Sequence, residues 1–274
     1  MDGKVGKYVR RIIPRRKGFR TKKGKVEKHI ESIVSSGRGV FMGLIDPDKH
    51  TPDKGAKLAK IMEKGGADII MLGGSIGAQG QQLDEMAKRI KESVSVPLHL
   101  FPGNIGNITS HADSMYFMSL LNSKNPYWIT GAQSLGAPLV QKYGIEAIPT
   151  AYLVFEPGQT VGYVGEANLL PRDKPDVPVA YAMAARYMGM RFVILESGSG
   201  APSPVPLPIV AAIRKMADIN IVIAGGVKTP EDASELIKAG ANCIHIGTRI
   251  EDGNNPLEQA TKFAKAIHVK RKRS

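Results

Sequence analysis

The chain has 274 residues, of which 42% are hydrophobic, enough for the core of one large domain or two small ones. Its single cysteine, Cys243, excludes a disulfide framework within the chain and a cysteine-clustered zinc site, and it favours a reducing, cytosolic compartment. No apolar run approaches the roughly 18 residues of a membrane span, and no apolar stretch of a secretory signal follows the basic N-terminus.

The formal net charge of +13 is concentrated at the two ends of the chain. Residues 1–29 hold twelve lysines and arginines against two acidic residues, and residues 262–274 hold six basic residues and no acidic one. Residues 30–261 therefore carry a net charge of −3. We expect a basic extension at 1–29, one folded domain at 30–268 and a basic tail, 269–274. The ends serve either solubility or contact with nucleic acid or anionic membrane.

From residue 40 onward, short β-rich runs alternate with longer helical patterns. The first predicted helix has Thr51 as its N-cap and Pro52 at its first position, which is typical of a helix start. Helices are predicted over 52–65, 81–93, 128–143, 177–188, 204–216, 230–239 and 257–268. Strands are predicted over 40–46, 68–72, 97–101, 114–118, 148–155, 192–196, 219–224 and 243–246.

The eight predicted strands are mostly continuous apolar runs, as expected when both faces of a parallel sheet are buried. Their alternation with helices predicts a (β/α)₈ barrel, with a doubly wound open sheet as the alternative. Residues 102–113, between the third and fourth strands, leave little room for a helix, so we expect the third helix to be missing or reduced to a turn. Residues 156–176 are rich in glycine, proline and polar residues, which favours a functional loop or lid.

The active site of such a barrel lies where the carboxyl ends of its strands meet. Asp46 follows the first strand, and a carboxylate there suits Mg²⁺, although Asp before Pro is equally typical of a turn. Gly73 and Gly74 follow the second strand and allow close approach of a ligand. The hydroxyl of Ser75 is then available to a metal or a phosphate.

The last three strands are followed by residues suited to an anion. Glu196 ends the sixth strand at a depth where a carboxylate is rarely placed for packing alone. Backbone N–H groups after the seventh and eighth strands form the recurrent phosphate site of these barrels, with ordinary tight turns as the alternative. A metal-bound phosphate facing a backbone-bound one suggests two phosphorylated substrates. The residues concerned are Ser197, Gly198, Ser199, Gly200, Gly225, Gly226, Gly247 and Thr248.

Other classes of site find no support in the sequence. The six histidines show no HExxH spacing, no GxxxxGK[ST] loop is present, residues 73–77 do not spell GxGxxG, and neither Ser197 nor Ser199 lies in a GxSxG elbow. Trp128 and Tyr143 are interpreted as helix-packing or interface residues.

Seven motifs in order resemble the geranylgeranylglyceryl phosphate synthases, the archaeal prenyltransferases of the first ether-lipid step, over roughly residues 30–268. They are LIDPDK (44–49), GGS (73–75), LFPGN (100–104), LLNS (120–123) with Trp128 following, ESGSGA (196–201), AGGVKTPEDA (224–233) and GTRIED (247–252).

The resemblance implies a modified (β/α)₈ barrel with its third helix replaced, and a reaction joining sn-glycerol 1-phosphate to geranylgeranyl diphosphate. It implies Mg²⁺ held at Asp46 and Ser75. Related bacterial heptaprenylglyceryl phosphate synthases carry a lysine where this chain has Leu44, which points to the archaeal branch. The glycerol phosphate would contact Leu195, Glu196, Ser197, Gly198, Ser199, Gly200, Gly225, Gly226, Gly247 and Thr248.

For this reaction Asp46 and Glu196 are the expected catalytic residues. Glu196 would either stabilise the developing allylic cation or accept the proton of the glycerol hydroxyl. The missing third helix would open an apolar groove for the prenyl tail beside Phe101, Tyr116 and Phe117. We expect a cytoplasmic homo-oligomer, dimer or hexamer, with peripheral contact to anionic membrane. The alternatives are another phosphate-binding barrel enzyme and an RNA-binding barrel with basic tails.

Overall fold

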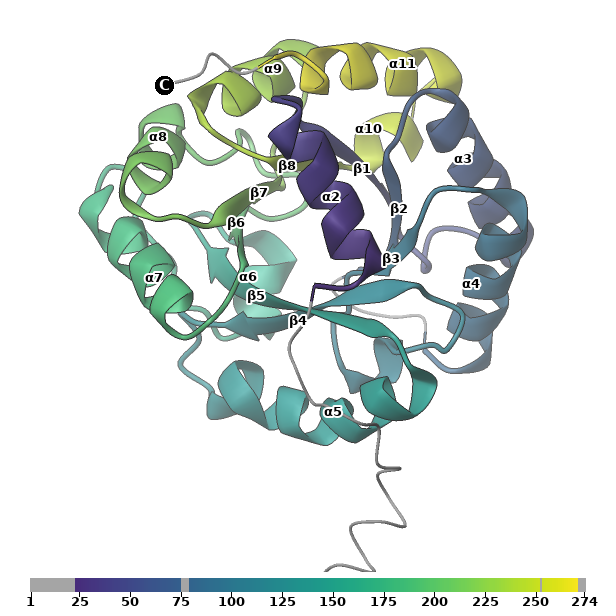
Figure 1. Cartoon of the computed structure of the whole chain (residues 1–274), viewed down its shortest axis with the longest axis horizontal. Coiled ribbons are helices and arrows are strands. Elements are labelled where there is room, and N and C mark those ends of the chain that lie inside the picture. Colours follow the sequence, from purple (N-terminus) through teal and green to yellow (C-terminus); the bar gives the residue numbers. More distant parts are fainter. Residues whose placement is uncertain (1–22, 75–78, 252, 271–274) are drawn as a thin grey trace, which may run out of the picture.

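The computed structural model describes residues 23–74, 79–251 and 253–270. Eight parallel strands close into a barrel in which each strand pairs with its neighbours along the chain and β8 pairs with β1 (Figure 1). The closed sheet confirms the predicted barrel and excludes the open doubly wound sheet. The strands are β1 (Val40–Ile45), β2 (Ile69–Leu72), β3 (Leu98–Leu100), β4 (Ser114–Leu120), β5 (Glu146–Val154), β6 (Phe192–Glu196), β7 (Asn220–Ala224) and β8 (Cys243–Ile246).

Helices surround the barrel, and the one after β1 begins as predicted, with the Thr51 side chain accepting a hydrogen bond from the backbone N–H of Lys54. Between β3 and β4 the fully described connection forms a single 3₁₀ turn, η1 (Ile105–Asn107), which confirms the expected loss of the third helix. The outer helices are α3 (Pro52–Lys64), α4 (Gln81–Ser93), α5 (Ala132–Tyr143), α7 (Asp176–Tyr187), α8 (Leu207–Met216), α9 (Pro230–Ala239) and α11 (Pro256–Ile267).

Three shorter elements refine the prediction at the site end of the barrel. The segment 156–176 contains a helix, α6 (Gln159–Val164), and β8 is followed by the four-residue α10 (Thr248–Glu251). A π-helical turn, η2 (Tyr127–Gly131), precedes α5, so the helix predicted over 128–143 is irregular in its first turn.

Side chains alternate between two hydrophobic clusters because successive residues of a strand point to opposite faces of the sheet. Leu153 and Leu195 belong to the outer cluster, between the strands and the helices. Met42, Tyr116 and Phe192 belong to the inner cluster, which fills the barrel. The alternation therefore decides which strand residues can reach a site inside the barrel.

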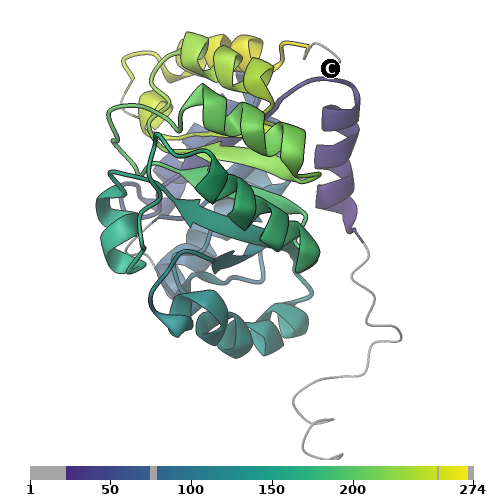
Figure 2. The same ribbon diagram turned by 90° about the vertical axis from the view of Figure 1, so that its left-hand side faces the viewer.

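Helix α2 (Lys25–Ser35) closes the amino-terminal end of the barrel, and the sequence analysis did not predict it. Its buried residues Val26, Ile30 and Ile33 join the inner cluster. Figure 1 shows α2 lying across this end, and Figure 2 shows it at the opposite end of the barrel from α6. The helix begins within the segment expected to be a basic extension.

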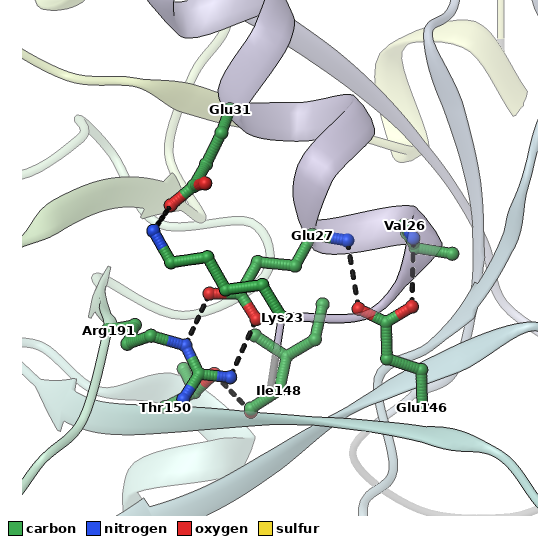
Figure 3. A network of polar contacts seen from close by, with 8 residues as sticks. All are labelled: Lys23, Val26, Glu27, Glu31, Glu146, Ile148, Thr150 and Arg191. Atoms are coloured by element: carbon green, nitrogen blue, oxygen red, sulfur yellow. Dashed lines mark hydrogen bonds and ion pairs between the residues drawn. The ribbon is translucent and has the colours of Figure 1, made fainter. Parts of the chain in front are cut away.

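Polar contacts fix α2 to the barrel floor (Figure 3). The Glu146 carboxylate at the start of β5 accepts hydrogen bonds from the backbone N–H groups of Val26 (2.8 Å) and Glu27 (3.0 Å), and so satisfies the helix start in place of a capping side chain. A side chain at Gly24 would collide with that carboxylate. Glu27 is fully buried and forms a two-armed ion pair with Arg191, with Nη2 to Oε2 at 2.6 Å.

Replacement of Glu27 by alanine should lower the free energy of unfolding by about 3–5 kcal/mol, because it leaves the Arg191 guanidinium partly buried without its partner. Glu31→Ala is the matched control, since Glu31 pairs with Lys23 on the more exposed face of the same helix and should cost about 1 kcal/mol or less. Urea unfolding of both variants measures the difference. Equal losses would contradict the role assigned to the buried pair.

Candidate active site

A cavity of about 470 Å³ lies at the carboxyl ends of the strands, the end of the barrel away from α2. The loops after β1, β2, β6, β7 and β8 all contribute to its wall. Parallel strands bring these loops together although they are far apart in the sequence. The predicted site residues that line the cavity are Asp46, Glu196, Ser199, Gly200, Gly225, Gly226, Gly247 and Thr248.

The remaining predicted residues take other places. Leu195 lies in the outer cluster, so its side chain faces the helices rather than the cavity. Ser197 and Gly198 form the turn behind the cavity wall, where the backbone N–H of Ser197 bonds to the carbonyl of Ala224. Ser75 lies outside the described residues.

Glu196 is the last residue of β6 and is 5% exposed. Its Oε1 accepts a 2.6 Å hydrogen bond from the backbone N–H of Gly198, and its Oε2 accepts a 3.1 Å bond from the Tyr152 hydroxyl. Burial raises the pKa of Glu196 to about 7, although both hydrogen bonds act to lower it. A carboxyl group that titrates near neutrality suits a general base.

Asp46 follows β1 and is half-buried at the cavity wall. Its Oδ1 accepts a 3.0 Å hydrogen bond from the backbone N–H of Asp48. Burial raises the pKa of Asp46, and the negative charges of Asp48 and Glu251 act in the same direction. A Cβ atom on Gly74 would lie 2.8 Å from Oδ1, so only glycine leaves the carboxylate its room.

Glu251, in α10, organises the loop that carries Asp46. One of its oxygens accepts a 3.0 Å hydrogen bond from the backbone N–H of Asp46 and lies 3.3 Å from Nε2 of His50. The other oxygen pairs with Nζ of Lys49 at 3.3 Å. The sequence analysis missed Glu251, since nothing in its local pattern shows that β1 and α10 meet.

The loops after β6, β7 and β8 form the side of the cavity suited to a phosphate. Gly225 has a φ of +72°, and a Cβ there would lie 2.3 Å from Oε1 of Glu196. Lys228 and Arg249 also line the cavity and supply positive charge on this side. Backbone close to the ligand space together with these two cations is what an anionic group requires.

Gly226 lines the cavity, as its sequence context predicts, and it also packs closely against a neighbouring loop. Its φ is +73°, and a Cβ would lie 2.3 Å from the carbonyl oxygen of Ser203, in the β6–α8 loop. A side chain would therefore displace that neighbouring loop rather than simply crowd a ligand. At Gly200, with a φ of +77°, a Cβ would meet nothing within 4 Å.

The opposite side of the cavity is apolar and extends to η1 and α5. Phe101, Tyr116 and Phe117, the side chains expected to form a groove, all line it. The single turn of η1 leaves this flank without the third barrel helix. Further apolar lining comes from Ile105, Ile108, Met115, Met118, Trp128 and Ala132.

Trp128 packs against the inner cluster, which agrees with the packing role predicted from the sequence. It also lines the cavity from the π-helical turn η2, which the sequence analysis did not predict. Its ring packs edge-to-face against Tyr127 at 4.9 Å, and Tyr127 in turn donates a 2.7 Å hydrogen bond to Asn104 beside η1. Such π-helical turns are frequent at functional sites, and this one is visible in the structure alone.

Arg172 joins the 156–176 segment to the loop after β6. Its Nη1 donates to the Glu156 carbonyl (3.1 Å) and to Oγ of Ser197 (3.3 Å). Its Nη2 donates to Oγ of Ser203 (2.9 Å) and to the Pro204 carbonyl (2.6 Å). These bonds hold the loop that lies behind the phosphate side of the cavity.

Comparison with known proteins places these features in a family. Residues 33–267 match the PcrB family. Geranylgeranylglyceryl phosphate synthase of Pyrococcus horikoshii is 50% identical over 244 residues, covering 89% of this chain and 95% of the relative. The enzyme of that name from Methanothermobacter marburgensis is 47% identical over 243 residues, 89% of this chain and 98% of the relative.

Solved structures agree with the sequence comparison. The crystal structure of (S)-3-O-geranylgeranylglyceryl phosphate synthase from Thermoplasma acidophilum in complex with sn-glycerol-1-phosphate superposes with a TM-score of 0.86 at 38% identity, covering 90% of this chain and 99% of that one. A thiamine phosphate pyrophosphorylase from Pyrococcus furiosus reaches 0.56 at 12% identity, over 85% of this chain and 97% of that one, which shows the shared fold alone. The match over nearly the whole barrel means that this chain belongs to the PcrB family.

Proposed function

We propose that the protein transfers a geranylgeranyl group from its diphosphate to sn-glycerol 1-phosphate, forming the ether bond of geranylgeranylglyceryl phosphate and releasing diphosphate. The observation that carries the proposal is one cavity in which a buried carboxylate lies between an apolar flank and the loops suited to phosphate. The family relatives of this name and the relative's complex with sn-glycerol-1-phosphate support it.

In this reaction the glycerol hydroxyl oxygen attacks the allylic carbon, and the bond from that carbon to the diphosphate breaks. Glu196 accepts the hydroxyl proton, which its pKa of about 7 allows near neutral pH. As a carboxylate, Glu196 also stabilises the positive charge that develops on the allylic carbon. The positively charged side chains of Lys228 and Arg249 attract and hold the negatively charged phosphate of the glycerol substrate.

The donor set near Asp46 fits Mg²⁺. Mg²⁺ is typically held through one or two carboxylates with substrate phosphates and water completing its shell, and a half-buried carboxylate facing the cavity meets that need. Among the described residues no group of three or more acidic, histidine or cysteine side chains could hold a metal alone. Asp46, with Ser75 as the second proposed ligand, would hold the ion, and the bound ion would neutralise charge on the leaving diphosphate.

The activity is tested by incubating the full chain with labelled sn-glycerol 1-phosphate, Mg²⁺ and prenyl diphosphates of increasing length. A labelled lipid that extracts into organic solvent, formed best from the geranylgeranyl compound, is the expected product. If no prenyl diphosphate yields labelled lipid, the proposed reaction is wrong.

The basic ends are proposed to hold the enzyme at anionic membrane, where a prenyl substrate and a lipid product reside. Each lysine or arginine near such a surface contributes about 1 kcal/mol, and salt screens this attraction. No helix among residues 23–74, 79–251 and 253–270 is long and apolar enough to cross a bilayer.

Deletion of residues 1–22, which leaves α2 and its contacts with Glu146 intact, should weaken sedimentation with anionic vesicles. Turnover on detergent-dispersed substrate should stay nearly unchanged, because none of the sequence motifs that follow the strands lies in the deleted stretch. Vesicle binding by the full chain should fade as salt rises. The membrane role would be rejected if the shortened protein co-sediments with the vesicles as well as the full chain does. It would also be rejected if the full chain shifts RNA in a gel but does not bind the vesicles.

We also propose that the chain self-associates as a dimer or hexamer. Leu135 is 64% exposed and Tyr143 38% exposed on α5, so this helix carries apolar surface that a second copy can cover. Light scattering at micromolar concentration should give at least twice the mass of the 29.5 kDa chain. A monomer would refute this proposal.

A further inference from the structure

Tyr152 was not identified as a site residue from the sequence, yet its side chain contacts the central carboxylate of the cavity. The 3.1 Å bond from its hydroxyl to Oε2 of Glu196 complements the bond from the Gly198 N–H to Oε1, so each carboxylate oxygen has one donor. We infer that Tyr152 is a positioning residue for the proposed prenyl transfer, holding Glu196 oriented and ionised for its work. This inference rests on the function proposed above.

The Tyr152 ring is itself held in place by an aromatic group inside the barrel. Phe101 packs edge-to-face against it, with ring centroids 5.6 Å apart. Phe101 also packs edge-to-face against Tyr116 at 5.8 Å and against His245 at 5.2 Å. Because the ring is 6% exposed and packs against Phe101, its hydroxyl is a preorganised donor rather than one that must be ordered during the reaction.

The Tyr152 hydroxyl acts as a donor throughout the neutral range. Burial raises the pKa of Tyr152 well above its ordinary value, and the neighbouring charge of Glu196 raises it further, so the phenol keeps its proton. A hydrogen bond given to a carboxylate favours the ionised form. Tyr152 and the Gly198 N–H therefore oppose the burial that raises the pKa of Glu196 to about 7.

Other ionisable groups face the same cavity but act on Glu196 less directly. Burial lowers the pKa of His245 to about 3, so it carries no charge near neutrality. In the described part of the chain, Tyr152 gives the one side-chain hydrogen bond that Glu196 receives. The remaining ionisable groups lining the cavity, from β1, β4, β7 and β8, are Asp46, Lys49, Tyr116, Lys228, Arg249 and Glu251. Arg172, from the 156–176 segment, bonds to the adjacent Ser197.

Tyr152→Phe removes the hydroxyl and keeps the ring, and Tyr116→Phe is its matched control. Tyr116 lies in the same aromatic group, but its hydroxyl contacts Nε2 of His245 at 3.1 Å rather than Glu196. The probe is the carboxyl ¹³C signal of labelled glutamate in the free enzyme, with the Glu196 signal assigned by its absence in Glu196→Gln. The same three variants are assayed for kcat between pH 5 and 9.

Tyr152→Phe should raise the titration midpoint of Glu196 by about one pH unit, as expected for loss of a hydrogen bond to a charged group. The acidic limb of the pH profile of kcat should move to higher pH by the same amount. Turnover relative to the parent protein should then fall about tenfold near pH 6 and recover at pH 9. In Tyr116→Phe the midpoint and the acidic limb should stay in place, whatever the rate.

Two results would overturn the inference. One is an unchanged Glu196 midpoint in Tyr152→Phe, even with lower thermal stability, since Tyr152 would then be a packing residue. The other is a shifted midpoint with an unmoved acidic limb, since the ionisation of Glu196 would not govern turnover. The titration needs no substrate, so it stays informative if the parent protein makes no labelled lipid, a result that would instead reject the proposed function.

Discussion

Glu196→Gln should lower kcat by about 10²- to 10⁴-fold while changing KM little, because the amide can neither accept the glycerol proton nor oppose a developing cation. The glutamine side chain retains an oxygen that can accept the hydrogen bond from the Gly198 N–H. Its NH₂ group can donate to the oxygen of the Tyr152 hydroxyl, so the local structure should persist. Steady-state kinetics with each substrate varied in turn measures the effect.

The control for this variant is Glu235→Gln, which removes one carboxylate from the exposed face of α9. It should leave both constants near those of the parent protein. A loss in Glu196→Gln that falls on KM alone would show Glu196 to be a binding residue without a part in the transition state.

Glu196→Gln should also change the thermal stability of the protein, and the direction of the change follows from the pKa of Glu196. The pKa of Glu196 is about 7 in the folded protein and near 4.5 when unfolded, so the folded state binds more protons between those values. Stability of the parent protein therefore falls as pH rises through this window. Glu196→Gln should unfold at a higher temperature than the parent at pH 8, and the gain should shrink toward pH 5.

Asp46→Asn should lower turnover by about 10²- to 10³-fold with the fold intact, because a neutral amide holds Mg²⁺ poorly and the leaving diphosphate would then lack the cation that neutralises its charge. The contact that organises this loop runs from the backbone N–H of Asp46 to Glu251, so the substitution leaves it in place. Turnover as a function of Mg²⁺ concentration, together with a thermal unfolding curve, measures both parts of the expectation.

Asp48→Asn is the matched control for that variant. Asp48 is exposed, and its backbone N–H, rather than its carboxylate, bonds to Oδ1 of Asp46. Its turnover should remain within a few-fold of the parent. Near-native turnover of Asp46→Asn at saturating Mg²⁺ would remove Asp46 from the catalytic residues.

The sequence by itself determined the architecture and the end of the barrel at which to look. Alternating apolar runs and helical patterns identified eight buried strands, and the short 102–113 connection predicted the missing third helix. Asp46, Glu196 and the Gly225-Gly226 pair were identified because each lies at or directly after the end of a strand, and in a parallel barrel all strands end at one rim. Their convergence on one cavity follows from topology, which local periodicity is sufficient to predict.

The tertiary structure alone decided which side chains meet at that rim. The contact of Tyr152 with Glu196 joins residues 44 positions apart, and that of Asp46 with Glu251 spans 205 positions. Helix α2 begins in the basic segment 1–29 and continues beyond it, and the charge at its start concealed the apolar face of Val26, Ile30 and Ile33. Periodicity shows that a side chain faces the barrel interior, but its partner depends on the stagger between strands and on the loops, which only closure of the barrel sets.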